Sequence, residues 1–570
     1  MKNLSLIVLI LLSIAARSQN SENTNHSLPY FELLDQYRKL DDYSEKAKLI
    51  GYGKTDCGEP LQLFVISGTS IFNPERLHEL GKCILFINNG IHPGEPDGMD
   101  ASLLFAKNIL SDPNNNALLE NVVVCIIPTF NIDGALNRDS TSRVNQNGPE
   151  EYGFRGNSKN LDLNRDFIKT DASNTHSLKS ILLQWSPDVF VDTHVSDGAD
   201  YQYTMTLISS QYNKMNPVCG KYMHETFTPL LFKSMKEKGD EMSTYVSTLS
   251  EQSIPDSGIV AFLETPRFAS GYMSLYNTFS FITETHMLKP FQSRKKSTYR
   301  FLNSILKICS ENKKEILKIR SEAFKNDSAI KEYKYNWELN SNQFEPITFN
   351  GYTAEYPISS VTGMKRLKYN HEKPYSKKIN YYNTYEAKSS IKIPRYFYLP
   401  QAYENIARLL EGNGIICNRV QHDSLSKCQS IIIDDYKTTS APYEGHYLHS
   451  NITTHSIDEF VNVAKGDYMI STNQPTIRIL MEVLTPDAVD SYFAWGFFDS
   501  ILQEKEWFLD YVFEDIAEKM LKENNDLKMK FEKWKLENPN KDSFNQLFFI
   551  YQNSPYFEKG FKKYPVRLIY

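Results

Sequence analysis

The chain has 570 residues, of which 41% are hydrophobic and 23% are charged, and its formal net charge is −6. This composition is that of a folded globular protein and excludes an intrinsically disordered chain. The length favours two or three domains. An acidic balance without basic runs argues against nucleic acid or an anionic membrane as a partner.

The first eighteen residues have the pattern of a secretory signal peptide. Lys2 supplies a positive start, residues 4–16 are mostly apolar, and Ala16-Arg17-Ser18 offers a small-x-small cleavage site. This apolar run is too short to span a bilayer, and no later stretch of the sequence reaches the roughly 18 apolar residues of a transmembrane helix. We therefore expect an exported protein without a membrane span.

Between residues 60 and 290, short apolar runs alternate with helical patterns. The expected elements are a helix at 97–110 and strands at 61–66, 83–87, 122–127, 188–191 and 279–283. Continuous apolar runs such as 83–87 are typical of strands that are buried on both faces. The alternation predicts an α/β fold with a mixed, largely parallel central sheet and helices on both faces.

The second half of the chain has a different pattern. We expect a charged helix at about 313–334, a polar, tyrosine-rich segment to about 390, and then a strand at 396–399, a helix near 401–411 and a strand at 414–420. The predicted organisation is a signal peptide at 1–18, a main domain at 19–310, a linker or extension at 311–390, and a smaller C-terminal α/β domain at 391–570. The sequence gives no function for this last domain.

Histidine and glutamate residues follow two of the expected strands. His92 and Glu95 lie three positions apart in a Gly/Pro-rich turn after the strand at 83–87, and His194 follows the strand at 188–191. The H-x-x-E pattern alone is weak, because solvated loop residues match it often by chance. Together the three residues make a set of two imidazoles and one carboxylate, which is typical of a catalytic zinc site with one open position.

Further motifs occur in a fixed order along the same region. Arg155 is followed by the segment Asn-Leu-Asp-Leu-Asn-Arg-Asp-Phe at 160–167, and Glu284 lies at the end of the last expected strand. The order H-x-x-E, Arg, D-x-N-R, His and Glu resembles the metallocarboxypeptidase family of the carboxypeptidase A type, over about residues 30–300. The resemblance implies that 19–310 is the catalytic domain of a zinc-dependent enzyme with one Zn²⁺ per chain. Its partner would be a peptide with a free C-terminal carboxylate.

The resemblance also assigns the metal-binding roles. His92, Glu95 and His194 match the three zinc ligands of the family. Asp162 matches the aspartate that orients a ligand histidine, which fixes the imidazole tautomer and raises its basicity.

The remaining motif residues match groups that act on the substrate. Asn164 and Arg165 match the pair that binds the terminal carboxylate, a task that suits the planar guanidinium. Arg155 matches the arginine that polarises the scissile carbonyl, and Arg143 is a less well spaced alternative. Glu284 matches the general base that takes a proton from water and returns it to the leaving amine.

The chain departs from the family pattern after the third ligand. The family's best-known members have Ser-Tyr there, whereas Val195-Ser196 follows here. The mobile tyrosine that caps the bound terminus is assigned to Tyr272 in preference to Tyr276, and Arg267 is a candidate for lining the specificity pocket. The alternative for all three is a structural role in aromatic packing or as a solvated arginine.

A second group of histidines lies in the C-terminal half, at His446, His449 and His455. No carboxylate or cysteine pattern accompanies them, so we expect a solvated loop and no metal site.

Two other functions fit parts of the pattern. An N-acyl-amino-acid deacylase of the aspartoacylase type resembles the same zinc, Asn-Arg and Glu pattern, although export and chain length count against it. A catalytically silent binding module on the same fold would require a blocked cleft, because every catalytic residue type is present.

Overall fold

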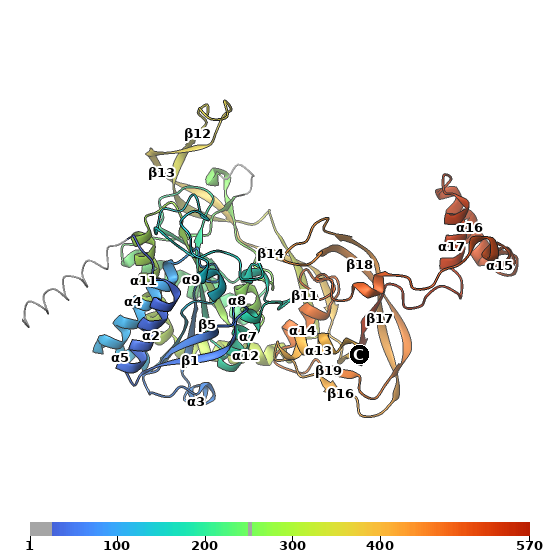
Figure 1. Cartoon of the computed structure of the whole chain (residues 1–570), viewed down its shortest axis with the longest axis horizontal. Coiled ribbons are helices and arrows are strands. Elements are labelled where there is room, and N and C mark those ends of the chain that lie inside the picture. The colour runs from blue at the N-terminus through green and yellow to red at the C-terminus, as the bar shows by residue number, and fades with distance from the viewer. Residues whose placement is uncertain (1–24, 249–253) are drawn as a thin grey trace, which may run out of the picture.

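The computed structural model describes residues 25–248 and 254–570, so the expected signal peptide lies outside the described residues. Figure 1 shows an N-terminal unit beside a C-terminal unit, with a β-hairpin and a group of helices projecting from them. Within the described part of the chain, no helix is both long and apolar enough to cross a membrane.

The N-terminal unit is built on an eight-stranded sheet with the order β1-β2-β4-β3-β5-β10-β6-β7. The strands are β1 (Ala47–Lys54), β2 (Pro60–Ile66), β3 (Cys83–Asn88), β4 (Val122–Ile127), β5 (Val189–Ser196), β6 (Met205–Ser209), β7 (Ser243–Thr244) and β10 (Phe279–His286). The four central strands β4, β3, β5 and β10 run parallel, and β2 and β6 flank them in the antiparallel direction. This confirms the predicted mixed, largely parallel sheet.

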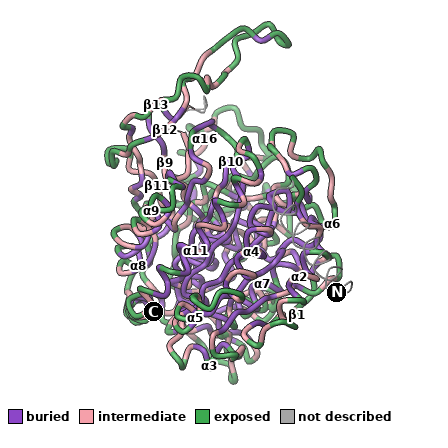
Figure 2. Tube along the Cα trace, turned by 90° about the vertical axis from the view of Figure 1, so that its left-hand side faces the viewer, coloured by how far each residue is buried: buried purple, intermediate pink, exposed green. Residues whose placement is uncertain are grey.

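Helices cover both faces of this sheet. They are α2 (Tyr30–Tyr43), α3 (Pro74–Glu79), α4 (Asp97–Ser111), α5 (Asn116–Leu119), α6 (Ile132–Leu136), α7 (Ser173–Trp185), α8 (Pro217–Tyr222), α9 (Thr228–Glu237), α10 (Ala269–Ser274), α11 (Phe291–Glu311) and α12 (Lys313–Asp327). Successive strand residues point to opposite faces. Phe86 therefore packs in one hydrophobic cluster with residues of α7 and α10, whereas Leu85 packs in a second with residues of α4, α9 and α11. Figure 2 shows the buried segments concentrated around these helices.

The segment expected as a linker or extension consists of α12 and two β-ribbons. β11 (Glu332–Leu339) pairs with β14 (Tyr385–Lys392), and β12 (Glu345–Glu355) pairs with β13 (Lys368–Tyr382) in the hairpin that projects in Figure 1. The end of β13 pairs in parallel with β9 (Ile259–Val260), and β9 pairs in the antiparallel direction with β8 (Ser247–Thr248). The expected helix at 313–334 thus ends at Asp327, because Tyr333, Tyr335 and Trp337 alternate with polar residues at the strand period.

The C-terminal unit is a six-stranded, fully antiparallel sheet with the order β16-β19-β15-β20-β17-β18. Its elements are β15 (Tyr396–Leu399), α13 (Glu404–Glu411), β16 (Asn418–Arg419), β17 (Ser424–Thr438), β18 (His449–Val463), β19 (Tyr468–Ser471), α14 (Ile477–Leu484) and β20 (Lys563–Ile569). The projecting helices α15 (Asp510–Glu523), α16 (Asn525–Glu537) and α17 (Ser543–Gln552) have a small core of their own.

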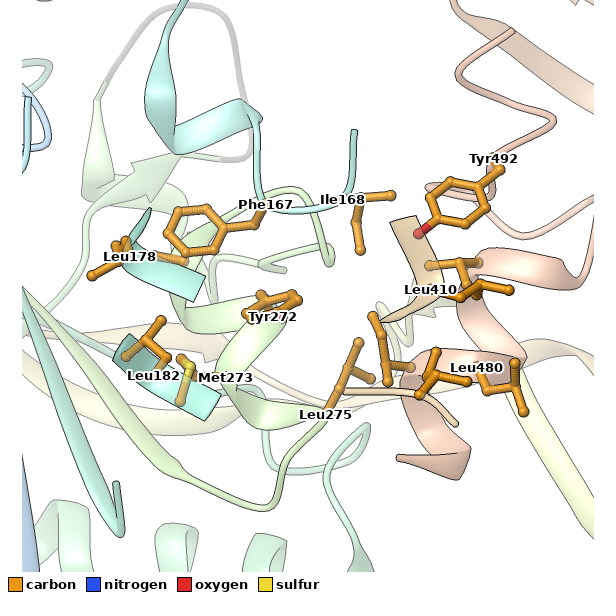
Figure 3. Packing of buried hydrophobic residues seen from close by; sticks show 14 of the residues in the cluster. Phe167, Ile168, Leu178, Leu182, Tyr272, Met273, Leu275, Leu410, Leu480 and Tyr492 are labelled. Carbon is orange, nitrogen blue, oxygen red and sulfur yellow. The ribbon is translucent and has the colours of Figure 1, made fainter. Parts of the chain in front are cut away.

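The two units share a hydrophobic core. Phe167, Tyr272 and Leu275 of the N-terminal unit belong to the same cluster as Leu410 and Tyr492 of the C-terminal unit (Figure 3). Because separating the units would expose this apolar surface to water, the packing holds them in a fixed relation.

Candidate metal centre and active site

Three side chains from two neighbouring strand ends converge in the N-terminal unit. His92 and Glu95 lie in the turn after β3, and His194 lies near the end of β5, which pairs with β3 in parallel. All three residues are buried, and one potential ligand atom of each lies within 4.8 Å of the others. The structure therefore brings together the three ligands predicted from the sequence.

Carboxylates orient both imidazoles of this cluster. His92 Nε2 lies 2.9 Å from Asp162 Oδ1, and His194 Nε2 lies 3.0 Å from Asp192 Oδ2. This leaves the two Nδ1 atoms facing Glu95, at 3.3 Å from His92 and 3.1 Å from His194. The buried His92 Nδ1 has no hydrogen-bond partner. A buried nitrogen left unpaired between a carboxylate and a second imidazole fits a Zn²⁺ ligand.

Charged groups of both signs meet in this cluster. Burial acts against the charged form of His194, but Asp192 and Glu95 raise its pKa well above the usual value. Burial acts in the same way against the ionised form of Glu95, yet the charges of His92 and Arg143 hold its pKa well below the usual value. The buried cluster thus favours the ionised form of Glu95 and the protonated form of His194.

Glu284 lies beside this cluster at the end of β10. It is the register partner of His194 in the parallel pairing of β10 with β5. Burial, opposed by His194 and reinforced by Glu95, raises the pKa of Glu284 to about 8. A divalent cation bound at the cluster would lower this pKa, because it favours the ionised carboxylate. Glu284 is therefore placed to exchange protons near neutral pH.

A cavity of about 370 Å³ opens over the cluster and Glu284. This volume is within the range of small-ligand sites. The other residues that line this cavity are Arg143, Arg155, Asn164, Arg165, Val195, Ser196, Asp197, Ile208, Tyr245, Phe262, Phe268 and Ile282. A larger cavity, of about 690 Å³, lies against the β11–β14 ribbon and contains none of the cluster residues.

Two arginines reach the cluster from the loop between β4 and β5. Arg143 donates to Glu95 Oε1 at 2.9 Å and to the carbonyl of Val195 at 3.1 Å. Arg155 makes two contacts with Asp162 Oδ2, at 3.0 and 2.8 Å. The side chain of Arg155 is 45% exposed and that of Arg143 only 16%, so Arg155 is the more accessible to a substrate.

Asn164 and Arg165 form one wall of the cavity. Asn164 Oδ1 accepts a hydrogen bond from the Ala269 amide at 3.0 Å, which fixes the amide group. The Arg165 guanidinium lies 4.3 Å from the centre of the Phe268 ring. Its Nε donates to the hydroxyl of Tyr443 at 3.2 Å.

Tyr272 and Arg267 are not among the residues that line the cavity. The Tyr272 ring is 1% exposed, and its hydroxyl lies 3.0 Å from both Tyr276 Oη and Asn413 Oδ1. This burial corrects the expected role at the substrate and leaves the alternative of aromatic packing. Arg267 pairs with Asp490 at 2.7 Å instead of contacting the cavity, so it is an interface residue.

Tyr245 lines the cavity and has no counterpart among the sequence predictions. It follows the two-residue strand β7, far upstream of Glu284 in the chain, and no local motif marks it. Burial and the nearby Glu284 raise its pKa, which keeps the phenol protonated and able to donate a hydrogen bond.

The second histidine group does not form a metal cluster. His446, His449 and His455 each contact a different carboxylate, at 2.8 Å from Asp171, 2.9 Å from Asp499 and 2.6 Å from Asp434. The expectation of a solvated loop holds for His455 and is wrong for His446 and His449, because packing against the C-terminal core shields those two side chains.

The part of the chain that carries this site is similar to a known family. Residues 34–212 match the sequence profile of the family described as zinc carboxypeptidase. The matched range contains His92, Glu95 and His194 and ends before Glu284. The matched region thus falls within the part of the chain whose motif order resembles that family.

Relatives that are named carboxypeptidases align with most of the chain. The chain is 20% identical over 484 residues to Carboxypeptidase 2 of Trichophyton tonsurans, covering 81% of this chain and 80% of that protein. It is also 20% identical over 457 residues to Carboxypeptidase 2 of Trichophyton rubrum, covering 77% of each. Among solved structures, a metallo-carboxypeptidase from Pseudomonas aeruginosa aligns with 50% of this chain and 68% of its own, at 14% identity and a TM-score of 0.37. Thrombin activatable fibrinolysis inhibitor aligns with 51% of this chain and 78% of its own, at 14% identity and a TM-score of 0.37.

Proposed function

We propose that this chain is an exported zinc-dependent metallocarboxypeptidase that hydrolyses the last peptide bond of peptides with a free C-terminal carboxylate. The observation that carries the proposal is the convergence of the His92, Glu95 and His194 cluster with Glu284 and Arg165 in one cavity.

The residues divide the reaction between them. Bound Zn²⁺ would supply a Lewis acid that polarises the scissile carbonyl and acidifies water. Glu284 accepts the proton of the attacking water on its carboxylate and then delivers it to the leaving amine. Arg155, the more exposed of the two arginines at the cluster, donates to the oxyanion that develops on the substrate. Arg143 remains with Glu95 and supports its orientation.

Asp162 connects the cluster to the substrate clamp. Its Oδ1 holds His92, while Arg155 contacts its Oδ2 and Arg165 lies 3.9 Å from the same oxygen. A terminal carboxylate bound by Asn164 and Arg165 would therefore lie close to the cluster. Only the last peptide bond of a bound chain then reaches Glu284, which supports an exopeptidase.

Tyr245 takes the role that the sequence assigned to Tyr272. It lines the cavity, and its raised pKa keeps the phenol protonated. We propose that Tyr245 donates a hydrogen bond to the bound C-terminal end of the substrate.

Export rests on the N-terminal sequence pattern, and sequencing the N-terminus of protein recovered from the culture medium tests it.

The activity is tested with a library of peptides that differ in their last residue. We expect release of single C-terminal residues, loss of activity with a zinc chelator, and no cleavage of the same peptides with amidated ends. Hydrolysis of N-acyl amino acids without cleavage of any peptide would favour a deacylase of the aspartoacylase type. Zinc binding without any hydrolysis would favour a silent binding module.

A further inference from the structure

A loop of the C-terminal unit reaches the residues of the proposed active site. It consists of residues 439–448, between β17 and β18, and is called here the 439–448 loop. We propose that this loop completes the substrate-carboxylate subsite, with Tyr443 positioning Arg165 and Glu444 positioning Asp162. The inference rests on the proposed carboxypeptidase function and adds a contribution of the C-terminal unit to it.

Tyr443 holds the guanidinium that is proposed to bind the substrate. Its hydroxyl accepts a hydrogen bond from Arg165 Nε at 3.2 Å. Arg165 Nη1 also donates to the carbonyl of Asn164 at 2.8 Å, and Phe268 covers one face of the guanidinium at 4.3 Å. Asn164 and Phe268 belong to the N-terminal unit, whereas Tyr443 belongs to the C-terminal unit. The Tyr443 contact therefore adds a constraint on the orientation of the Arg165 guanidinium that the N-terminal unit does not supply.

Glu444 holds the backbone of the residue that orients His92. Its Oε2 accepts a hydrogen bond from the Asp162 amide at 2.7 Å. Glu444 has a φ of +49°, in the left-handed region that costs a non-glycine residue free energy. Such a backbone conformation persists where the surrounding contacts determine it, and it gathers at functional sites. The strained turn therefore points to a loop that is shaped for this contact.

The loop is anchored independently of these two contacts. His446 lies 2.8 Å from Asp171 Oδ2 and 2.8 Å from the carbonyl of Trp495. The Arg267 guanidinium lies 5.6 Å from the Tyr443 ring and 5.0 Å from the Trp495 ring. Removal of the Tyr443 hydroxyl alone should thus leave the loop docked, which separates positioning from folding.

The first test compares Y443F with Y447F. Tyr447 lies on the same loop and is 52% exposed, so its variant is the matched control. We measure kcat and KM on the peptide of the library that the wild-type protein cleaves best. We expect Y443F to raise KM about ten-fold with kcat within about two-fold, because one hydrogen bond to a charged group is lost. Y447F should match the wild type in both constants.

An unchanged KM in Y443F, alongside active wild-type protein, would overturn the inference and leave the carboxypeptidase function intact. Failure of the wild-type protein to cleave any peptide of the library would overturn the proposed function, and with it this inference. A KM increase shared equally by Y443F and Y447F would also contradict a specific role of Tyr443.

The second test compares E444A with E444Q. The glutamine keeps an oxygen that can accept from the Asp162 amide, whereas alanine removes it. We expect E444A to weaken zinc binding about ten-fold in competition with a chromogenic chelator, since Asp162 orients His92, and E444Q to restore it. Equal zinc affinity of E444A and the wild type would rule out the role of Glu444. Circular dichroism checks that all variants fold.

Discussion

Asp162 Oδ1 lies 2.9 Å from His92 Nε2, and this contact joins the proposed metal ligands to the proposed substrate clamp. The other oxygen of the same carboxylate holds Arg155 at 2.8 Å. Burial disfavours a charge on Asp162, yet His92, Arg155 and Arg165 hold its pKa well below the usual value. One ionised carboxylate thus contacts His92 and Arg155 and lies 3.9 Å from Arg165, the residues proposed to bind zinc and substrate.

The charge of Asp162 should matter for metal affinity. We expect D162N to weaken zinc binding about 10 to 100-fold, because the amide accepts from His92 without making the imidazole more basic. Competition with a chromogenic chelator measures this affinity. D35N, a change of an exposed aspartate on α2, is the control. Equal zinc affinity of D162N and the wild type would show that Asp162 does not support His92.

Glu284 should be needed for turnover and not for metal binding. We expect E284Q to keep about one zinc per chain and to lose kcat by about 1,000-fold or more, since glutamine cannot accept the proton of water. Metal analysis and steady-state kinetics on the same preparation measure both quantities. Turnover like that of the wild type would remove Glu284 from the mechanism.

The three arginines of the cavity should differ in the kind or the size of their effect on kcat and KM. We expect R155K to lower kcat about 100 to 1,000-fold, as loss of an oxyanion donor does. R165K should mainly raise KM, because lysine cannot bind a carboxylate with two parallel hydrogen bonds. R143K should have a smaller effect on kcat than R155K. The reverse ranking of R143K and R155K would move the oxyanion role to Arg143.

The contact between His446 and Asp171 should make stability depend on pH. The hydrogen bond that His446 donates to Asp171 raises the pKa of His446, against the effect of burial. Burial would raise the pKa of Asp171, but His446 and Lys169 lower it to about 2. The His446 contribution is therefore complete below its unfolded pKa of about 6.5 and is lost as pH rises through the higher folded pKa.

The measurement is the free energy of unfolding in urea at pH 5.5 and at pH 9. We expect H446Q to be less stable than the wild type by about 1 kcal/mol at pH 5.5, with a smaller difference at pH 9. H455Q is the control, since His455 is 54% exposed. A difference between H446Q and the wild type that grows with pH would contradict this assignment.

The metal cluster was predictable from the sequence because its residues follow apolar strands in short local motifs. Parallel strands bring their carboxyl ends to one edge of a sheet, so His92 and His194 had to approach each other if β3 and β5 were neighbours. The positions of Tyr245, Tyr443 and Glu444 were not predictable in this way, because each depends on packing between distant segments and no motif marks it.

The same distinction applies to the fold. The buried strand β3 is predictable from its continuous apolar run, whereas the sheet of the C-terminal unit depends on non-local pairing. Its central strand β15 lies between β19 and β20, and β20 comes from the last residues of the chain. The antiparallel order of such a sheet is set by register between distant strands and cannot be read from local patterns.

The central claim is that His92, Glu95 and His194 bind one catalytic zinc ion. The most direct measurement is the zinc content and peptidase activity of the wild-type protein and H194A, each dialysed against the same low zinc concentration. We predict about one zinc per chain and chelator-sensitive cleavage for the wild type, with both lost in H194A. Retention of zinc and activity in H194A at wild-type levels would contradict the account.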